Sequence, residues 1–141
     1  MYEKRNTAVF IDGENMPAKK AAAIMKEVKK RGVIDTVKVY GMQKDQTTKK
    51  WSEVALITKG MKDIRLSGGP ARNKVDMKIK KDTIHDVKAA PNVDIVIIVS
   101  SDHGYAENIR ELRLMGKHVV VIGEAKAPKS LRRACNEFVQ V

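Results

Sequence analysis

The apolar residues of the chain gather in short runs that alternate with stretches of helical periodicity. Residues 93–99 form the longest run. It is rich in Val and Ile, too short to cross a membrane, and typical of a strand buried on both faces of a parallel sheet. This run leads through Ser100 and Ser101 to Asp102, and a second run, residues 8–11, leads to Asp12. The pattern therefore predicts two central strands that each end beside an aspartate.

The rest of the chain continues the alternation of strands and helices. Because the connections are short, this order requires a mainly parallel sheet of five or six strands with helices on both faces. We predict one domain, residues 1–141, of the three-layer α/β class. Strands are predicted at residues 6–11, 34–40, 63–66, 93–99, 118–122 and 138–141, and helices from about 17 to 32, 48–59, 75–89, about 105–116 and 128–135, with a loop at 67–74.

Lys and Arg outnumber Asp and Glu by 28 to 17, which gives a formal net charge of +11. Such a surface favours nucleic acid as the partner, and a merely solubilising surface is the alternative. The single Cys135 excludes an internal disulfide and a cysteine-built zinc site, so we expect a cytoplasmic protein. No apolar run reaches the length of a membrane helix, and we expect no membrane partner. The oligomeric state stays open, with a homodimer as one option.

Three aspartates, Asp12, Asp76 and Asp102, occupy positions in the predicted fold that indicate a functional site. The carboxyl ends of parallel strands meet at one edge of a sheet, so Asp12 and Asp102 reach one pocket if their strands are neighbours where the strand order reverses. Asp76 lies on the helix predicted for residues 75–89, facing inward, where an unpaired carboxylate is costly. The apolar arc that surrounds it consists of Val75, Met77, Ile79, Ile84 and Val87.

Each of these acids also has a purely structural explanation. Asp76 could favour the start of its helix through the helix dipole. Asp12 could hold the following turn together, and Asp102 could cap the next helix. Asn15 could likewise be a helix cap. We favour a metal site, because one common function explains three aspartates at one sheet edge better than three unrelated structural roles do.

The chemistry of this metal site follows from its donors. Carboxylate oxygens without Cys or a His pair suit Mg²⁺ or Mn²⁺ rather than zinc. Two such ions about 4 Å apart would activate water and stabilise the leaving oxygen of a phosphodiester, which fits the basic surface. The side chains predicted to support the ligands are Asn15, Ser100, Ser101 and Asp82. The side chains predicted to hold the nucleic-acid backbone are Arg72, Lys74, Lys78 and Lys129.

With these residues in place, the chain resembles the NYN domain, a branch of the PIN-like nuclease fold. The resemblance implies a Rossmann-like parallel sheet with central strand order 3-2-1-4-5. It also implies divalent-metal-dependent cleavage of RNA, with Asp12, Asp76 and Asp102 as ligands and Asn15 as a polar support. The matching motifs are Phe-Ile-Asp-Gly-Glu-Asn at residues 10–15, Lys-Val-Asp at 74–76 with Asp82 six positions later, Val-Ser-Ser-Asp at 99–102 and the closing segment 129–138.

Two residues depart from the pattern of that family. Relatives commonly carry a further acid at the position of Gly104, and a small or apolar residue at the position of Lys80. Our leading hypothesis is an Mg²⁺- or Mn²⁺-dependent ribonuclease that uses a metal-activated water. The alternative, motivated by Gly104, is an RNA-binding module with weakened or lost nuclease activity. A small-molecule phosphohydrolase is the third hypothesis, in which Glu14 would have to replace the usual second acid.

Overall fold

The computed structural model describes residues 5–68 and 73–141. Its centre is a six-stranded sheet in which every recorded strand pair is parallel and the order is β3-β2-β1-β4-β5-β6. This confirms the predicted central order 3-2-1-4-5 and the predicted sixth strand, which lies at one edge. The strands are β1 (Asn6–Asp12), β2 (Val33–Met42), β3 (Met61–Leu66), β4 (Val93–Val99), β5 (His118–Gly123) and β6 (Glu137–Gln140).

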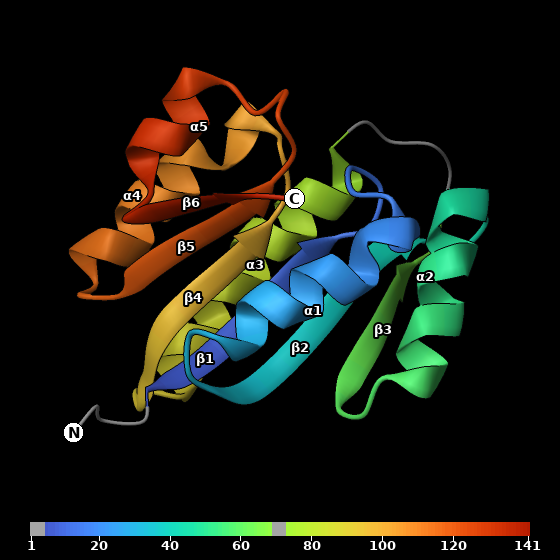
Figure 1. The fold of residues 1–141 in the computed structure, drawn as a ribbon, viewed down its shortest axis with the longest axis horizontal. Coiled ribbons are helices and arrows are strands. Elements are labelled where there is room, and N and C mark those ends of the chain that lie inside the picture. Colours follow the sequence, from blue (N-terminus) through green and yellow to red (C-terminus); the bar gives the residue numbers. More distant parts are fainter. Residues whose placement is uncertain (1–4, 69–72) are drawn as a thin grey trace.

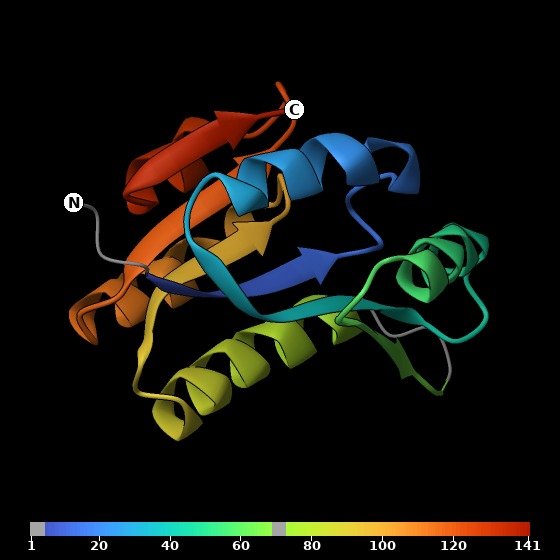
Figure 2. The same ribbon diagram turned by 60° about the horizontal axis from the view of Figure 1, so that its bottom comes forward.

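Helices cover both faces of the sheet (Figures 1 and 2). One face packs against α3, α4 and α5, and the opposite face packs against α1 and α2. The architecture is therefore the predicted three-layer α/β fold. The helices are α1 (Ala21–Lys29), α2 (Gln46–Ile57), α3 (Lys74–Ala89), α4 (Ala106–Leu114) and α5 (Lys129–Ala134), with short 3₁₀ turns η1 (Ala18–Lys20) and η2 (His103–Tyr105).

The burial of β4 explains why its sequence is a continuous apolar run. Val96 and Ile98 pack into the core beneath α3 and α4, whereas Ile95, Ile97 and Val99 pack into the core beneath α1 and α2. A strand that faces a helical layer on both sides has no solvent-facing row that would favour polar residues. The pattern of burial thus reproduces the interpretation made from the sequence.

The predicted boundaries shift by a few residues. The strand β2 is longer than residues 34–40, and α2 begins and ends two residues before the predicted range 48–59. The first helix opens as the 3₁₀ turn η1 after Pro17 before it becomes α-helical. None of the helices in the described part of the chain combines the length and apolar character needed to span a membrane.

One prediction about α3 is wrong. Met77 was placed on the apolar arc, but its side chain is 65% exposed. The buried positions Val75, Ile79, Thr83 and Val87 repeat every four residues, and Met77 lies midway between the first two. A residue two positions away from each faces the other side of a helix. Asp76, in contrast, is buried as predicted.

Candidate functional site

The carboxyl ends of β1 and β4 meet at a small polar pocket of about 160 Å³. These strands are parallel neighbours, with Ile11 opposite Val99, so the residues that follow them emerge at the same edge of the sheet. The first turn of α3 closes the pocket from the side. The described side chains that line it all carry oxygen atoms that can bind a cation: Asp12, Glu14, Asn15, Asn73, Asp76 and Asp102.

The loop after β1 is shaped by a close approach to β2. The Gly13 amide donates a hydrogen bond of 2.9 Å to the carbonyl oxygen of Tyr40. A Cβ at this position would lie 2.5 Å from that oxygen, so a larger residue would push the loop away from the sheet. Glycine therefore fixes where Asp12 and the residues after it enter the pocket.

Asp12 is held by four hydrogen-bond donors. Its Oδ1 accepts from the amides of Glu14 and Asn15, both at 3.2 Å. Its Oδ2 accepts from the hydroxyls of Tyr105 at 3.0 Å and Ser100 at 3.3 Å. Burial raises the pKa of the Asp12 carboxyl, and the Tyr105 hydrogen bond opposes that rise. The turn-holding role considered for Asp12 is thus real, and it coexists with a place in the pocket wall.

Asp76 is less well satisfied than Asp12. It is only 9% exposed, and its Oδ1 has no hydrogen-bond partner among the described residues. Its Oδ2 lies 3.6 Å from the ammonium of Lys80, one turn along α3. The same ammonium lies 5.7 Å from the centre of the Tyr105 ring. A buried carboxylate oxygen without a partner is the feature that a cation would satisfy best.

Asp102 caps the 3₁₀ turn η2, as its structural explanation predicts. Its Oδ1 accepts a hydrogen bond of 3.0 Å from the Gly104 amide and lies 3.5 Å from His103 Nδ1. Its amide donates to Ser100 Oγ at 3.1 Å. The side chain of Asp102 remains 35% exposed, so it is the most accessible of the three aspartates.

Asn15 and Ser101 connect the loops that carry the acids. The Ser101 amide donates to Asn15 Oδ1 at 2.7 Å, which joins the loop after β1 to the loop after β4. Ser101 Oγ accepts from the Glu124 amide at 2.8 Å, which joins the loop after β4 to the loop after β5. The next helical turn, η1, has Pro17 at its N-cap position, so the alternative role of Asn15 as that cap is wrong. Asn15 instead fixes the spacing between the strand ends.

Gly104 lies against two of the acids. A Cβ on this residue would sit 3.4 Å from Asp102 Oδ1 and 3.7 Å from Asp76 Oδ2, which are ordinary contact distances. Gly104 is also not among the glycines with positive φ, so a side chain would cause no backbone strain. An acid at this position would therefore place its carboxylate beside Asp76 and Asp102.

The donor set fits a hard divalent cation in chemistry but forms no complete cage. Within residues 5–68 and 73–141, no three His, Cys, Asp or Glu side chains are placed to hold one metal ion. Mg²⁺ commonly binds through one or two carboxylates, with water and substrate oxygens supplying the remaining ligands. The unpartnered Oδ1 of Asp76 is consistent with that mode.

Three of the basic residues predicted to hold nucleic acid, Lys74, Lys78 and Lys129, do not line the acidic pocket. Lys78 forms an ion pair of 2.9 Å with Asp82, and the Lys74 ammonium donates to the carbonyl of Ser67. Lys129 is exposed at the start of α5. Arg72 lies outside the described residues.

Asp82, predicted as a supporting residue, does not itself line the pocket. It accepts a hydrogen bond of 2.7 Å from the Tyr40 hydroxyl. This bond connects α3 to β2, since Asp82 lies in the second half of that helix and Tyr40 lies in the strand. The six-residue spacing places Asp82 further along α3 than Asp76, away from the edge where the other acids meet.

Three residues of the site were not predicted as such. Tyr105 was assigned to the core, yet its hydroxyl contacts Asp12; the requirement of a buried tyrosine for a partner was the available signal. Glu14 lines the pocket, and partial burial followed by repulsion from Asp12 raises the pKa of its carboxyl. Asn73 precedes α3 in the left-handed region with φ of 65°, and its side chain makes no cap hydrogen bond.

The comparisons with known proteins identify the family of this chain. The model of the NYN domain family matches residues 6–141, so the chain belongs to the NYN domain family, which includes nucleases. The crystal structure of VPA0982, a protein of unknown function from Vibrio parahaemolyticus RIMD 2210633, has the same fold with a TM-score of 0.79. It is 21% identical in sequence, and the match covers 100% of this chain and 96% of that one. No curated protein matches the chain.

Proposed function

We propose that this NYN domain is a ribonuclease that cleaves RNA phosphodiesters with the help of Mg²⁺ or Mn²⁺. The observation that carries the proposal is the pocket in which Asp12, Asp76 and Asp102 meet, with one buried oxygen of Asp76 left without a partner. A bound divalent cation supplies a water of lowered pKa and neutralises charge on the phosphoryl oxygens. The net charge of +11 supports a polyanionic substrate.

In this proposal the side chains of the pocket have different roles in binding the cation. Asp76 and Asp102 would hold the cation, since one has a free oxygen and the other is the most accessible. Asp12 would be the third ligand, through its Oδ2. The hydrogen bonds to this oxygen come from two side-chain hydroxyls, which can rotate away when a cation binds. Asn15 keeps the two strand ends at a fixed spacing. Preorganised ligands of this kind save the cost of reorganisation when substrate binds.

The test is cleavage of end-labelled single-stranded and double-stranded RNA by the purified chain, with and without added Mn²⁺. Asp12→Asn and Asp102→Asn should each lower the metal-dependent rate by about 100-fold or more, because each removes a ligand charge without changing shape. Asp94→Asn is the matched control. It lies at the opposite end of β4, is exposed, and should leave the rate unchanged. Full activity in either pocket variant would refute the assignment.

A second candidate function is RNA binding without turnover, and Gly104 is the observation that favours it. Gly104 supplies no further carboxylate to the space beside Asp76 and Asp102. This candidate predicts salt-sensitive RNA binding without cleavage at any metal concentration. Gly104→Asp separates the two functions: a gain of Mn²⁺-dependent cleavage from a silent parent would mark the chain as a binding module, whereas an already active parent rules this candidate out.

A further inference from the structure

The two faces of the sheet are covered unequally. Three helices pack on one face, whereas only α1 and α2 pack on the other. The interval between α1 and α2 leaves the first half of β2 partly open, since Ile34 and Thr36 are only half-buried. Neighbouring helices in such a layer pack about 8–10 Å apart. A further helix that packed here would cover the apolar residues that line this interval.

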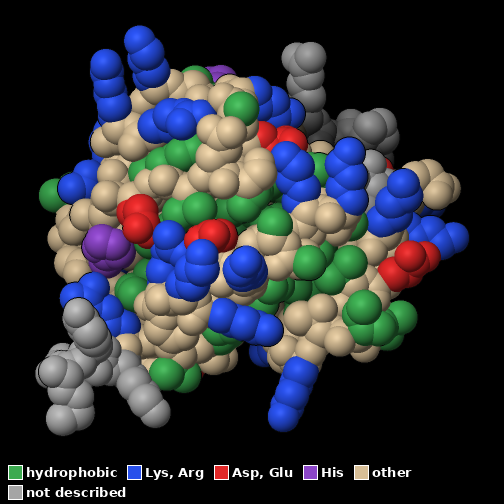
Figure 3. Space-filling view, in the orientation of Figure 1, with side chains coloured by type: hydrophobic (Ala, Val, Ile, Leu, Met, Phe, Trp, Pro, Cys, Tyr) green, Lys and Arg blue, Asp and Glu red, His purple; other side chains and the backbone are tan. Residues whose placement is uncertain are grey.

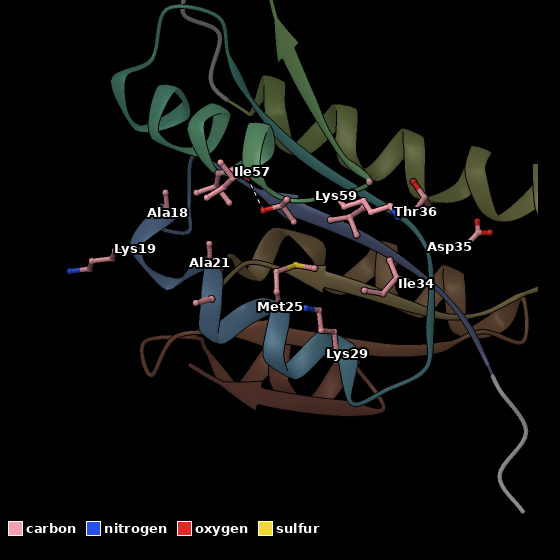
Figure 4. Close-up of a pocket in the computed structure, with 15 residues that line it drawn as sticks. Ala18, Lys19, Ala21, Met25, Lys29, Ile34, Asp35, Thr36, Ile57 and Lys59 are labelled. Carbon is pink, nitrogen blue, oxygen red and sulfur yellow. Dashed lines mark hydrogen bonds between the residues drawn. The ribbon is translucent and has the colours of Figure 1, made fainter.

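A groove of about 840 Å³ occupies this interval. Figure 4 shows Met25 of α1 and Ile57 of α2 on opposite sides of the groove, with Ile34 of β2 to the right of both. Ile57 is 87% exposed although it is apolar. We call this feature the α1–α2 groove. Its apolar lining includes Ala22, Met25, Ile34, Val37, Val54 and Ile57.

The lining residues on the helices follow helical spacing. On α1 they are Ala21, Ala22, Met25 and Lys29, of which the last three are separated by three and four positions. On α2 they are Val54 and Ile57, separated by three. Each helix thus presents one stripe to the groove, which is the geometry that receives an amphipathic helix with anchors three and four residues apart.

The rim of the groove is basic. Lys19, Lys29 and Lys59 line it, all three are exposed, and none forms an ion pair with another described residue. Asp35 is the acidic side chain among the lining residues. Figure 3 shows hydrophobic side chains on this face lying among Lys and Arg side chains. Like charge disfavours a second copy of a chain with net charge +11, and opposite charge favours an acidic partner.

We propose that the α1–α2 groove binds an amphipathic α-helix of a partner protein, with apolar residues along one stripe and Asp or Glu on its flanks. The apolar stripe would pack on Met25, Ile34 and Ile57, and the acidic flanks would face the three lysines of the rim. The groove shares no lining residue with the acidic pocket. The interaction is therefore separate from the proposed nuclease activity and stands whether or not the chain cleaves RNA.

The test uses fluorescein-labelled helical peptides with a leucine stripe at three- and four-residue spacing, in several registers, flanked by Glu. We expect saturable binding in fluorescence anisotropy, weakened severalfold when salt rises to about 0.5 M. A peptide with Lys in place of Glu, and one with Ser in place of Leu, should bind at least about tenfold more weakly. Equal binding of the Glu and Lys peptides, or no binding of any register, would overturn the proposal.

Two neighbouring alanines provide matched variants. Ala22 and Ala23 are both exposed in the first turn of α1, where Glu is compatible with the helix dipole, but only Ala22 lines the groove. Ala22→Glu should weaken binding of the acidic peptide at least about tenfold, and Ala23→Glu should change it less than about twofold. Circular dichroism verifies that both variants fold. An equal effect of the two substitutions would contradict the assignment.

Two further results would show that the α1–α2 groove binds something other than a partner helix. Concentration-dependent dimerisation of the unliganded chain, measured by analytical ultracentrifugation and abolished by Ala22→Glu, would assign it to a second copy. Binding to vesicles of phosphatidylserine and phosphatidylcholine, abolished by the same substitution, would assign it to a lipid surface. Either result overturns a partner helix.

Discussion

The strand side and the helix side of the acidic pocket differ in how their carboxylates are satisfied. On the strand side, Asp12 accepts four hydrogen bonds, two from backbone amides and two from hydroxyls. On the helix side, Asp76 has one oxygen without a partner and one oxygen 3.6 Å from Lys80. The strand side is therefore preorganised by the fold, and the helix side retains unused capacity to bind a cation.

This difference predicts which changes affect binding and which affect stability. A carboxylate that the fold already satisfies gains little when a cation arrives, because a donor must first turn away. A buried carboxylate oxygen without a partner gains most. Substitutions on the helix side should therefore change metal affinity most, whereas those on the strand side should also change the free energy of unfolding.

The largest expected effect is on the helix side. Asp76→Asn should lower Mn²⁺ affinity about 100-fold, or about 2.8 kcal/mol, because it removes the charge with the unpartnered oxygen. Isothermal titration calorimetry with Mn²⁺ measures this directly. Glu107→Gln, an exposed acid in the first turn of α4, controls for net charge. A loss of the same size in the control would mean that bulk charge alone governs Mn²⁺ binding.

The next effect belongs to the strand side. Asn15→Ala leaves the Ser101 amide without its acceptor, and we expect a loss of about 2 kcal/mol in the free energy of unfolding. Urea denaturation measures it, with the exposed Asn92→Ala as the control. If Asn15→Ala were as stable as the parent, the loop connection would not be what holds the strand ends together.

A smaller effect is expected from Lys80, whose ammonium group already lies near Asp76 on the helix side. Lys80 lies beside Asp76, so Lys80→Met should raise Mn²⁺ affinity about fivefold, or about 1 kcal/mol. The neighbouring Lys81→Met is exposed and should have less effect. Titration calorimetry of the two variants compares them at equal net charge. A fall in affinity for Lys80→Met would show that the lysine supports the site rather than competes with the ion.

The smallest expected effect depends on pH. Burial raises the pKa of Asp12 in the folded state, so the native carboxyl retains its proton more readily than the unfolded one. That contribution to stability is present below the unfolded pKa and is lost as pH rises through the folded pKa. Without metal, Asp12→Asn should therefore be more stable than the parent near pH 7, by about 1 kcal/mol or less, and this advantage should shrink towards about pH 4.

Thermal melts of the parent and Asp12→Asn across that pH range test this last expectation. The amide keeps an oxygen for the two backbone donors and offers its NH₂ to the Ser100 and Tyr105 hydroxyls. A stability advantage that grew as pH fell would reverse the assigned direction of the pKa shift.

Much of the fold was predictable because burial on both sides of a sheet leaves a clear pattern. The apolar runs of β1 and β4 predicted two central strands. Because Asp12 and Asp102 follow these runs, they were expected at one edge of the sheet, where the structure has them. The order of the strands came from the resemblance to the NYN family rather than from periodicity, and the family match confirms that resemblance. The periodic pattern of apolar residues thus predicted the strands and helices, and the family resemblance predicted the order of the strands.

The hydrogen-bond partners of the site were not predictable in the same way. Tyr105 donates to a residue 93 positions earlier, and Lys78 pairs with Asp82 instead of standing free. Such contacts depend on where two elements meet in space, and no periodic signal in the sequence records that. The left-handed backbone of Asn73 was likewise not predicted from the sequence.

The pairing of β1 with β4 has a consequence for biosynthesis. Phe10 lies opposite Ile98, so one edge of β1 has no partner until the ribosome has made most of the chain. Contacts so distant in sequence form slowly, because a long loop must close first. The nascent chain thus carries a hydrophobic strand with an open edge, which is a site for aggregation or chaperone capture. An intact acidic pocket would then report that synthesis has passed β4 and that β4 has paired with β1.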